Sequence, residues 1–153
     1  LAFGRDIPCA PVSTLEALAE NAAGLSGLIV PCMDARRGQF YTATFAATAE
    51  GISRMTPDRA ISAEELAEEL RSYEGDIYIT GDGYDVAHKL LTSLGVKLAV
   101  TPYLLRSQNA VSIARVAEKM HAQGLSVSER ELAPSYLRLP QAERERLERE
   151  NKI

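Results

Sequence analysis

The chain has 153 residues, a formal net charge of −4 and a charged fraction of 25%. This length fits one domain that buries about 68–70% of the surface its unfolded form exposes. The acidic balance argues against a broad nucleic-acid-binding surface, which needs clustered excess Lys and Arg. The longest apolar run is far shorter than the ~20 residues that cross a bilayer, so we expect a cytoplasmic protein with no membrane partner.

The first residues, Leu1 to Gly4, have the pattern of the last turn of a helix with its glycine cap, and no Met precedes them. We therefore expect the chain to be the C-terminal piece of a longer protein. Ile7 to Val12 predicts a short strand, and Ser13 or Thr14 followed by a Leu/Ala pattern predicts a capped helix. We assign residues 1–26 to the remnant of a preceding lobe.

A hairpin is predicted next. Gly27 to Met33 is nearly continuous apolar sequence, and Gln39 to Ala46 mixes aromatic, β-branched and small residues. The turn between them has the shape of a phosphate loop without its residues, because an Asp followed by glycines would let backbone amides close on a phosphate. Here Asp34 is followed by Ala35, Arg36 and Arg37, which crowd that approach.

Catalysis at this tip is therefore disfavoured. Two interpretations stay open: the exposed guanidiniums of Arg36 and Arg37 dock onto a partner, or the tip is a solvated polar turn.

The remaining elements follow from periodicity and capping. Ser62 stands three residues ahead of Glu65, a capping-box pattern that predicts a helix from Ser62 to Ser72. The other expected elements are a weak strand at Ile52–Met55, a strand at Asp76–Thr80, a helix at Tyr84–Leu94, a short strand at Lys97–Val100, a helix at Asn109–Gln123, a brief extended segment at Pro134–Arg138 and a charged, solvated tail at 141–153.

Gly81, Asp82 and Gly83 form a turn between a predicted strand and a predicted helix. This order is typical of a nucleotide-side crossover, in which glycines allow a phosphate to approach the backbone closely. A tight structural turn, with Asp82 near a helix N-terminus, explains the pattern equally well.

Cysteines and histidines give no metal pattern. Cys9 and Cys32 lie in separate apolar runs, without the C-x-x-C spacing of a zinc site, and are expected to be buried reduced thiols. His88 and His121 lie alone on different predicted helices, without His-x-x-x-His spacing. The serines have no nucleophile elbow, so both zinc and serine peptidase activities are disfavoured.

Three strands followed by helix, strand, helix, strand and helix predict an α/β fold, a ribonuclease H-like lobe over 27–140 with a mixed sheet flanked by helices. Four landmarks then resemble the TsaB (YeaZ) family, which is needed for threonylcarbamoyladenosine modification of bacterial tRNA. They are Val12–Ala19, Met33–Tyr41, Thr80–Gly83 and Pro134–Arg138 running into Pro140–Arg144.

The resemblance implies an actin-like, two-lobed ATPase fold of which this chain keeps the second lobe. It also implies a non-catalytic accessory subunit that scaffolds or stabilises the catalytic paralogue TsaD together with the ATPase TsaE. Homodimers form through first-lobe helices in this family, and tRNA is reached only through the complex. Older labels in the wider family suggest a glycoprotein peptidase, which the isolated histidines disfavour.

The alternative is an actin-like ATPase or phosphotransferase whose catalytic groups lie outside this chain. In either case we expect no cofactor and no metal, with ATP or ADP bound at most weakly or only in the full complex. The candidate degenerate nucleotide-side or partner contacts are Asp34, Arg36, Arg37, Gly81, Asp82 and Gly83.

Overall fold

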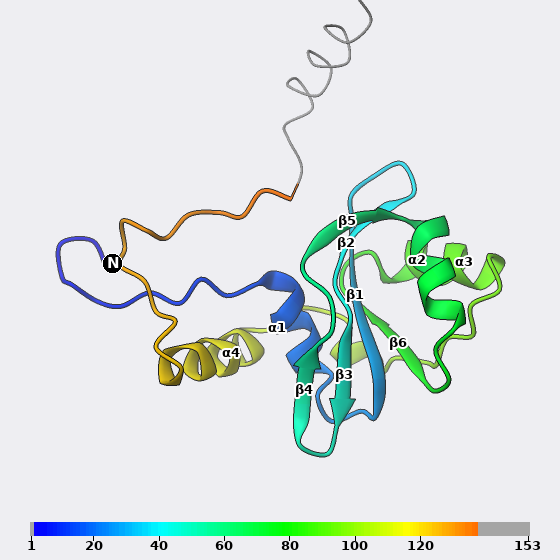
Figure 1. Cartoon of the computed structure of the whole chain (residues 1–153), viewed down its shortest axis with the longest axis horizontal. Coiled ribbons are helices and arrows are strands. Elements are labelled where there is room, and N and C mark those ends of the chain that lie inside the picture. The colour runs from blue at the N-terminus through cyan, green and yellow to red at the C-terminus, as the bar shows by residue number, and fades with distance from the viewer. Residues whose placement is uncertain (1, 138–153) are drawn as a thin grey trace, which may run out of the picture.

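The structure, a computed structural model, describes residues 2–137, and its elements are arranged in layers (Figure 1). The helices are α1 (Thr14–Asn21), α2 (Ala63–Arg71), α3 (Tyr84–Ser93) and α4 (Ala110–Ala122), with a 3-10 turn η1 (Tyr103–Leu105). The strands are β1 (Gly27–Asp34), β2 (Gln39–Thr42), β3 (Phe45–Thr48), β4 (Gly51–Arg54), β5 (Arg59–Ser62) and β6 (Ile77–Thr80).

β1 is the central strand of a mixed sheet. It pairs antiparallel with β2 and β3, and parallel with β6 along its other edge. β3 pairs with β4 and β2 pairs with β5, both antiparallel, which gives the order β4-β3-β1-β2-β5 with β6 beside β1. The predicted α/β architecture, a mixed sheet flanked by helices, is confirmed.

β2 and β3 are two halves of one long strand. Cys32 pairs with Thr42 and Ile29 pairs with Phe45, so the register against β1 is the same on both sides of the break. Leu28 donates its N–H to the Asp76 carbonyl, so the backbone N–H groups of even-numbered β1 residues point toward β6. The backbone N–H groups of odd-numbered residues point toward β2 and β3. Pro31 is odd-numbered and has no N–H to donate, which explains why the ladder breaks there.

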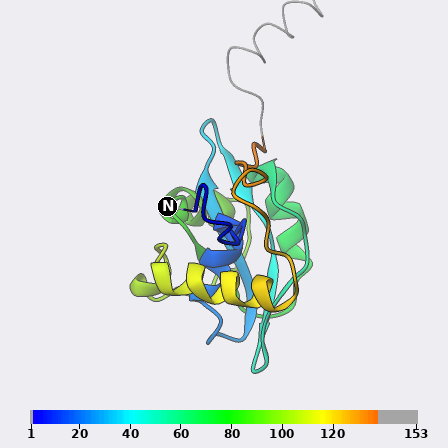
Figure 2. The same ribbon diagram turned by 90° about the vertical axis from the view of Figure 1, so that its left-hand side faces the viewer.

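The two faces of β1 are buried against different helices. Its even-numbered side chains, Leu28, Val30 and Cys32, lie in one cluster with Leu66 of α2 and Leu91 of α3. The odd-numbered face carries a second cluster whose members include Ile29, Leu15, Ala19 and Phe45. α1 packs on β1, and α4 packs on α1 across the front of the view in Figure 2. Strict alternation along one strand therefore fills both cores.

Most predicted helices and strands are confirmed to within one or two residues. Ser62 accepts a hydrogen bond from the Glu65 N–H at 3.2 Å, and the Glu65 carboxylate accepts one from the Ser62 N–H at 3.0 Å. This is the complete capping box, and it starts α2 at the residue after Ser62. Ser13 caps α1 and Asn109 caps α4 in the same way, each accepting a bond from the N–H three residues on.

Several predicted strands are wrong. Ile7–Val12 makes only an isolated bridge, in which Cys9 and Val127 exchange two backbone hydrogen bonds of 2.8 Å. Lys97–Val100 makes one ladder-like bond, from Ala99 to Ile77, and is not a strand. Neither segment continues this pairing into a ladder.

The ends of the chain also differ from expectation. Residues 3–6 form a turn, not the end of a helix. Pro134 to Leu137 forms no strand, and Tyr136 is 82% exposed. Arg138 and the charged tail at 141–153 lie outside the described residues, as does Leu1. Within residues 2–137 no helix has the length and apolar character needed to span a membrane.

Candidate functional site

The structure brings the two predicted landmark turns together. β1 and β6 run parallel, so their carboxyl ends, Asp34 and the turn at Gly81, meet at one edge of the sheet. A Cβ atom built on Gly81 would lie 2.3 Å from the Cys32 carbonyl oxygen. One built on Gly83 would lie 2.8 Å from that oxygen and 3.1 Å from the Asp34 nitrogen. Both positions therefore require glycine for packing against β1.

The two glycine amides of this turn are already used within the protein. Gly81 donates its N–H to the Arg106 carbonyl at 2.7 Å, and Gly83 donates to the Cys32 carbonyl at 3.0 Å. A phosphate cradle needs such amides to point at the ligand. The two glycine N–H groups instead hold the turn against β1 and against the loop before α4, while Asp82 is exposed.

Arg106 is a basic residue beside this turn that sequence reasoning missed. Its guanidinium carbon lies 3.7 Å from the centre of the Tyr84 ring, and its Nε donates to the Thr101 carbonyl at 2.9 Å. The Tyr84 ring in turn lies 5.6 Å from the His88 ring. No local pattern marks Arg106, because its position depends on a loop that returns to β6.

The hairpin tip has an unusual backbone. Arg36, Arg37 and Gly38 have consecutive φ angles of 69°, 55° and 70°, all left-handed. The Asp34 carboxylate accepts a hydrogen bond from the Arg36 N–H at 2.7 Å, and Ala35 donates to the Gln39 carbonyl at 3.0 Å. Left-handed φ costs an L-residue roughly 1–2 kcal/mol, and turns that need it at successive positions favour Asn-Gly. Two arginines therefore stand where the backbone disfavours them.

The side chains of these arginines face solvent. The Arg36 side chain is 87% exposed, and its Nη1 lies 3.8 Å from Asp34 Oδ2, an exposed ion pair of little strength. Arg37 is exposed, and no hydrogen bond or ion pair joins its side chain to any residue that the structure describes. The tip thus presents one guanidinium, that of Arg37, without an ion-pair partner among the described residues.

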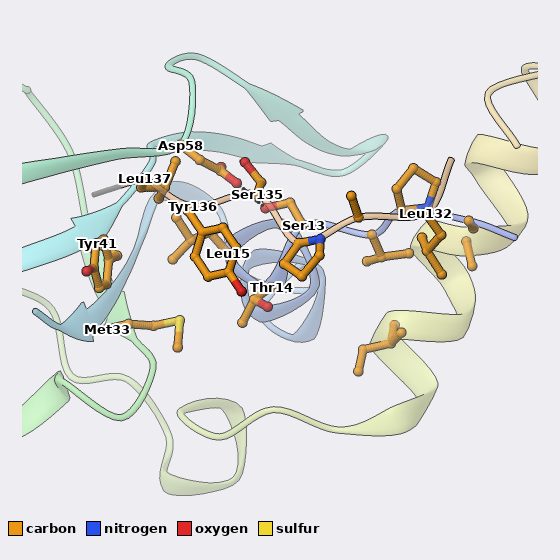
Figure 3. Close-up of a pocket in the computed structure, with 17 residues that line it drawn as sticks. Ser13, Thr14, Leu15, Met33, Tyr41, Asp58, Leu132, Ser135, Tyr136 and Leu137 are labelled. Carbon is orange, nitrogen blue, oxygen red and sulfur yellow. Dashed lines mark hydrogen bonds between the residues drawn. The ribbon is translucent and has the colours of Figure 1, made fainter. Parts of the chain in front are cut away.

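An open groove of about 1190 Å³ lies on the α1 side of the sheet, and sequence analysis did not predict it (Figure 3). It is mostly apolar and draws residues from four distant parts of the chain. The first part is residues 10–15, and the second is Met33 and Tyr41 of the hairpin together with Asp58. The third is Ile113 and Ala117 of α4, and the fourth is residues 132–137.

The polar groups at one wall of the groove satisfy one another. Ser13 Oγ donates to Asp58 Oδ2 at 2.6 Å, and Arg54 bridges Asp58 at 2.5 Å and Glu16 at 2.7 Å. Burial opposes the charge of Arg54, but its hydrogen bonds to Glu16 and Asp58 outweigh burial, so its pKa is raised. The guanidinium also lies 4.6 Å from the centre of the Phe45 ring. This network holds α1 to β4.

No metal-binding cluster of three or more His, Cys, Asp or Glu side chains occurs in residues 2–137. His121 Nδ1 lies 3.0 Å from Ser126 Oγ, and His88 packs beside Tyr84. Cys9 and Cys32 are both free thiols, and only Cys32 is fully buried.

Comparison with known proteins gives the family. A family model described as "TsaD: tRNA N6-adenosine threonylcarbamoyltransferase" matches residues 1–146. The chain belongs to the TsaD family. Among its curated relatives are two TsaB proteins, described as tRNA threonylcarbamoyladenosine biosynthesis proteins, so the resemblance to TsaB/YeaZ proteins is confirmed at the level of the family.

The relatives are longer than this TsaD-family chain. It is 29% identical over 144 residues to TsaB of Bacillus subtilis (strain 168), which covers 94% of this chain and 61% of the relative. It is 28% identical over 141 residues to TsaB of Escherichia coli (strain K12), covering 90% and 60%. The chain therefore spans about 60% of the length of these relatives.

Two solved structures from Pseudomonas aeruginosa share the fold of this family member. One is a protein with similarity to peptidase YeaZ, with a TM-score of 0.65 and 20% identity over 83% of this chain and 57% of that chain. The other is YeaZ, with a TM-score of 0.60 and 19% identity over 82% and 58%. They share the predicted α/β fold, a mixed sheet flanked by helices.

Proposed function

We propose that this protein is a non-catalytic accessory subunit for threonylcarbamoyladenosine modification of tRNA. In this role it scaffolds or stabilises a TsaD-like catalytic paralogue, together with a TsaE-like ATPase, and reaches tRNA only through that complex. The observation that carries the proposal is the match of the TsaD family model to residues 1–146, combined with similarity to two TsaB proteins.

The geometry of the two turns supports a non-catalytic role. Gly81 and Gly83 donate their N–H groups to carbonyls within the protein. Arg36 and Arg37 stand where a phosphate loop has glycines. The glycine N–H groups are thus bonded to backbone carbonyls, and arginine side chains stand at the hairpin tip, so neither turn offers free amides to a phosphate in the way a phosphate loop does. What remains is a folded lobe suited to contacts with other proteins.

We further propose that 27–140 forms the second lobe of a two-lobed protein, that 1–26 is the end of the first lobe, and that 141–153 is an appended tail. The protein would act in the cytoplasm and form homodimers through the first lobe. Expression from the complete gene and measurement of intact mass and oligomeric state test this division. An intact protein that starts at Leu1 contradicts it.

Reconstitution tests the accessory role. Purified TsaD-type and TsaE-type subunits from the same organism are incubated with tRNA, ATP, threonine, bicarbonate and the enzyme that supplies the activated threonylcarbamoyl group, with and without this protein. Digested tRNA is then analysed for threonylcarbamoyladenosine by mass spectrometry. We expect modification only when the protein is present, and co-purification with the TsaD-type subunit. Equal modification without it contradicts the proposal.

A second candidate is an ATPase or phosphotransferase of the same superfamily, since the matching family model is named for a transferase. Asp34→Asn separates the two, because the amide oxygen can still accept the Arg36 N–H and keep the turn. Loss of nucleotide turnover with intact complex formation favours the enzyme. Unchanged tRNA modification favours the accessory subunit.

A further inference from the structure

We propose that the hairpin tip formed by Arg36 and Arg37 docks onto a carboxylate-bearing surface of the TsaD-type subunit. This inference rests on the proposed function and assigns one contact within it. It is carried by the backbone conformation of the tip, by how firmly the tip is held, and by the lack of an ion pair to the Arg37 guanidinium among the described residues.

The first argument is the choice of residue. Three successive left-handed φ angles at residues 36–38 favour Gly or Asn, and only Gly38 satisfies that preference. Residues held in sparsely populated φ/ψ regions against their preference concentrate at functional sites. Arginine adds nothing to the packing of an exposed tip, so its value here lies in the guanidinium.

The second argument is rigid presentation. The base of the tip is closed by the Ala35 to Gln39 bond of 3.0 Å, and Gln39 donates back to the Arg36 carbonyl at 3.1 Å. Ala63, the first residue of α2, donates to the Gly38 carbonyl at 3.0 Å, which ties the tip to a capped helix. A partner that binds the two arginines therefore pays little entropy to order the backbone that carries them.

The third argument concerns the chemistry of the partner. Guanidinium groups bind carboxylates through two parallel hydrogen bonds, and arginine is enriched at protein interfaces. Binding to RNA needs several phosphate contacts and a positive surface, whereas this chain has a net charge of −4 and places exposed Glu64 and Glu65 at the start of α2, next to the tip. Two guanidiniums suffice for a bidentate carboxylate contact but supply too few charges for RNA, so a protein carboxylate is the better match.

The test uses variants that separate charge from backbone strain. Arg36→Asn with Arg37→Asn removes both guanidiniums and suits the left-handed backbone, whereas the double Lys variant keeps the charge and loses the planar fork. Arg115→Gln on α4 is the matched control, since Arg115 is also exposed. The Kd for the purified TsaD-type subunit is measured by calorimetry at two salt concentrations, and Tm is measured for each variant.

We expect the double Asn variant to raise Kd by at least about tenfold and to lose most of the salt dependence of binding. Its Tm should rise by about 2–4 °C as the strain is relieved. The double Lys variant should fall between it and the wild type, and the Arg115→Gln control should match the wild type. An unchanged Kd in the double Asn variant overturns the docking contact.

Two other results are distinguishable. If the wild-type protein does not bind the TsaD-type subunit at all, the proposed function is wrong, and so is the proposed contact. If the double Asn variant instead weakens binding of the protein to tRNA and leaves the Kd for the subunit unchanged, the carboxylate partner is wrong and the tip binds phosphate.

Discussion

Gly81 shows how a single residue type decides the packing at the carboxyl edge of the sheet. Its φ is +99°, and the nearest atom to an added Cβ is a backbone carbonyl oxygen of β1, which cannot move aside as a flexible side chain could. Gly95 has a similar φ of +85° but open space around it. An alanine at Gly95 would meet only the cost of the left-handed backbone, whereas an alanine at Gly81 would meet that cost and a steric clash.

We therefore expect Gly81→Ala to destabilise the protein far more than Gly95→Ala. The Gly95 change should cost about 1 kcal/mol, from the left-handed backbone alone. The Gly81 change should cost at least about 3 kcal/mol, because the Cys32 carbonyl must also shift. Urea denaturation of both variants measures the difference. Equal losses would show that β1 accommodates the methyl group.

Cys32 provides a prediction about pH. Burial raises its pKa to about 12, and a hydrogen bond with Thr42 only partly offsets this. The folded thiol stays protonated up to about pH 12, whereas the unfolded thiol ionises from about pH 9. The stabilisation of the fold by this group is therefore complete below about pH 9 and is lost as the pH rises toward 12. The free energy of unfolding should fall by about 1.4 kcal/mol per pH unit in this range from this group.

Cys32→Ala should remove this part of the alkaline slope. Urea denaturation at several pH values between 8 and 11 gives the slopes. This series starts near the ordinary pKa of an unfolded thiol, about 8.5, and extends well above it. Identical slopes for wild type and Cys32→Ala would contradict the burial argument.

Secondary-structure elements with a local signal were predictable from the sequence. α2 follows from Ser62 and Glu65, because a capping box needs only two residues that lie three positions apart. β5 was missed because Arg59–Ser62 is short and polar, and becomes a strand only by pairing with β2. Lys97–Val100 has the better strand composition and still lacks a ladder. Pairing partners, rather than propensity, decide such short segments.

The candidate site was predictable in part for the same reason. The turns at Asp34 and at Gly81–Gly83 were each predicted as candidate contacts from local patterns, whereas the parallel pairing of β1 and β6 that places them side by side comes from the structure. Arg106 and the groove were not predictable, because their positions depend on loops that return from distant parts of the chain. The left-handed arginines at the tip carry no sequence signal either, since arginine gives no indication of positive φ.

The contact between α1 and the loop before α4 depends on one side chain at the end of α1. Asn21 Nδ2 donates to the carbonyls of Leu104 at 3.3 Å and Ser107 at 3.0 Å. Its Oδ1 accepts from Asn109 Nδ2 and from Ser112 Oγ, the latter at 3.4 Å. Asn21 thus links α1 to the first turn of α4.

Asn21→Ala should therefore destabilise the protein by about 1 kcal/mol, since it removes hydrogen bonds whose freed groups are mostly exposed to water. Hydrogen exchange should become faster across residues 104–116, and should stay unchanged in β1. Gln108→Ala, at an exposed neighbouring position of the same loop, is the control. If both variants exchange alike, Asn21 does not organise this loop.

At the scale of the whole molecule, the sheet separates two environments. On the α2 and α3 side the core is closed, whereas on the α1 and α4 side the groove stays open beside Met33 and Tyr41. The relatives are longer than this chain, and its predicted first-lobe remnant lines the groove through residues 10–15. The molecule thus combines a closed carboxyl-edge turn with an open apolar face, an arrangement suited to association with proteins.

The last prediction concerns nucleotide binding by this chain on its own. Gly81 and Gly83 use their amides internally, and the tip offers arginine side chains where a phosphate loop offers glycine backbone, so we expect no measurable ATP affinity for this chain. Isothermal titration calorimetry with Mg-ATP tests this, with the TsaE-type ATPase as positive control in the same buffer. Micromolar binding by the chain alone would mean that the turn at Gly81 opens to admit a phosphate, and the accessory role would then have to include a nucleotide.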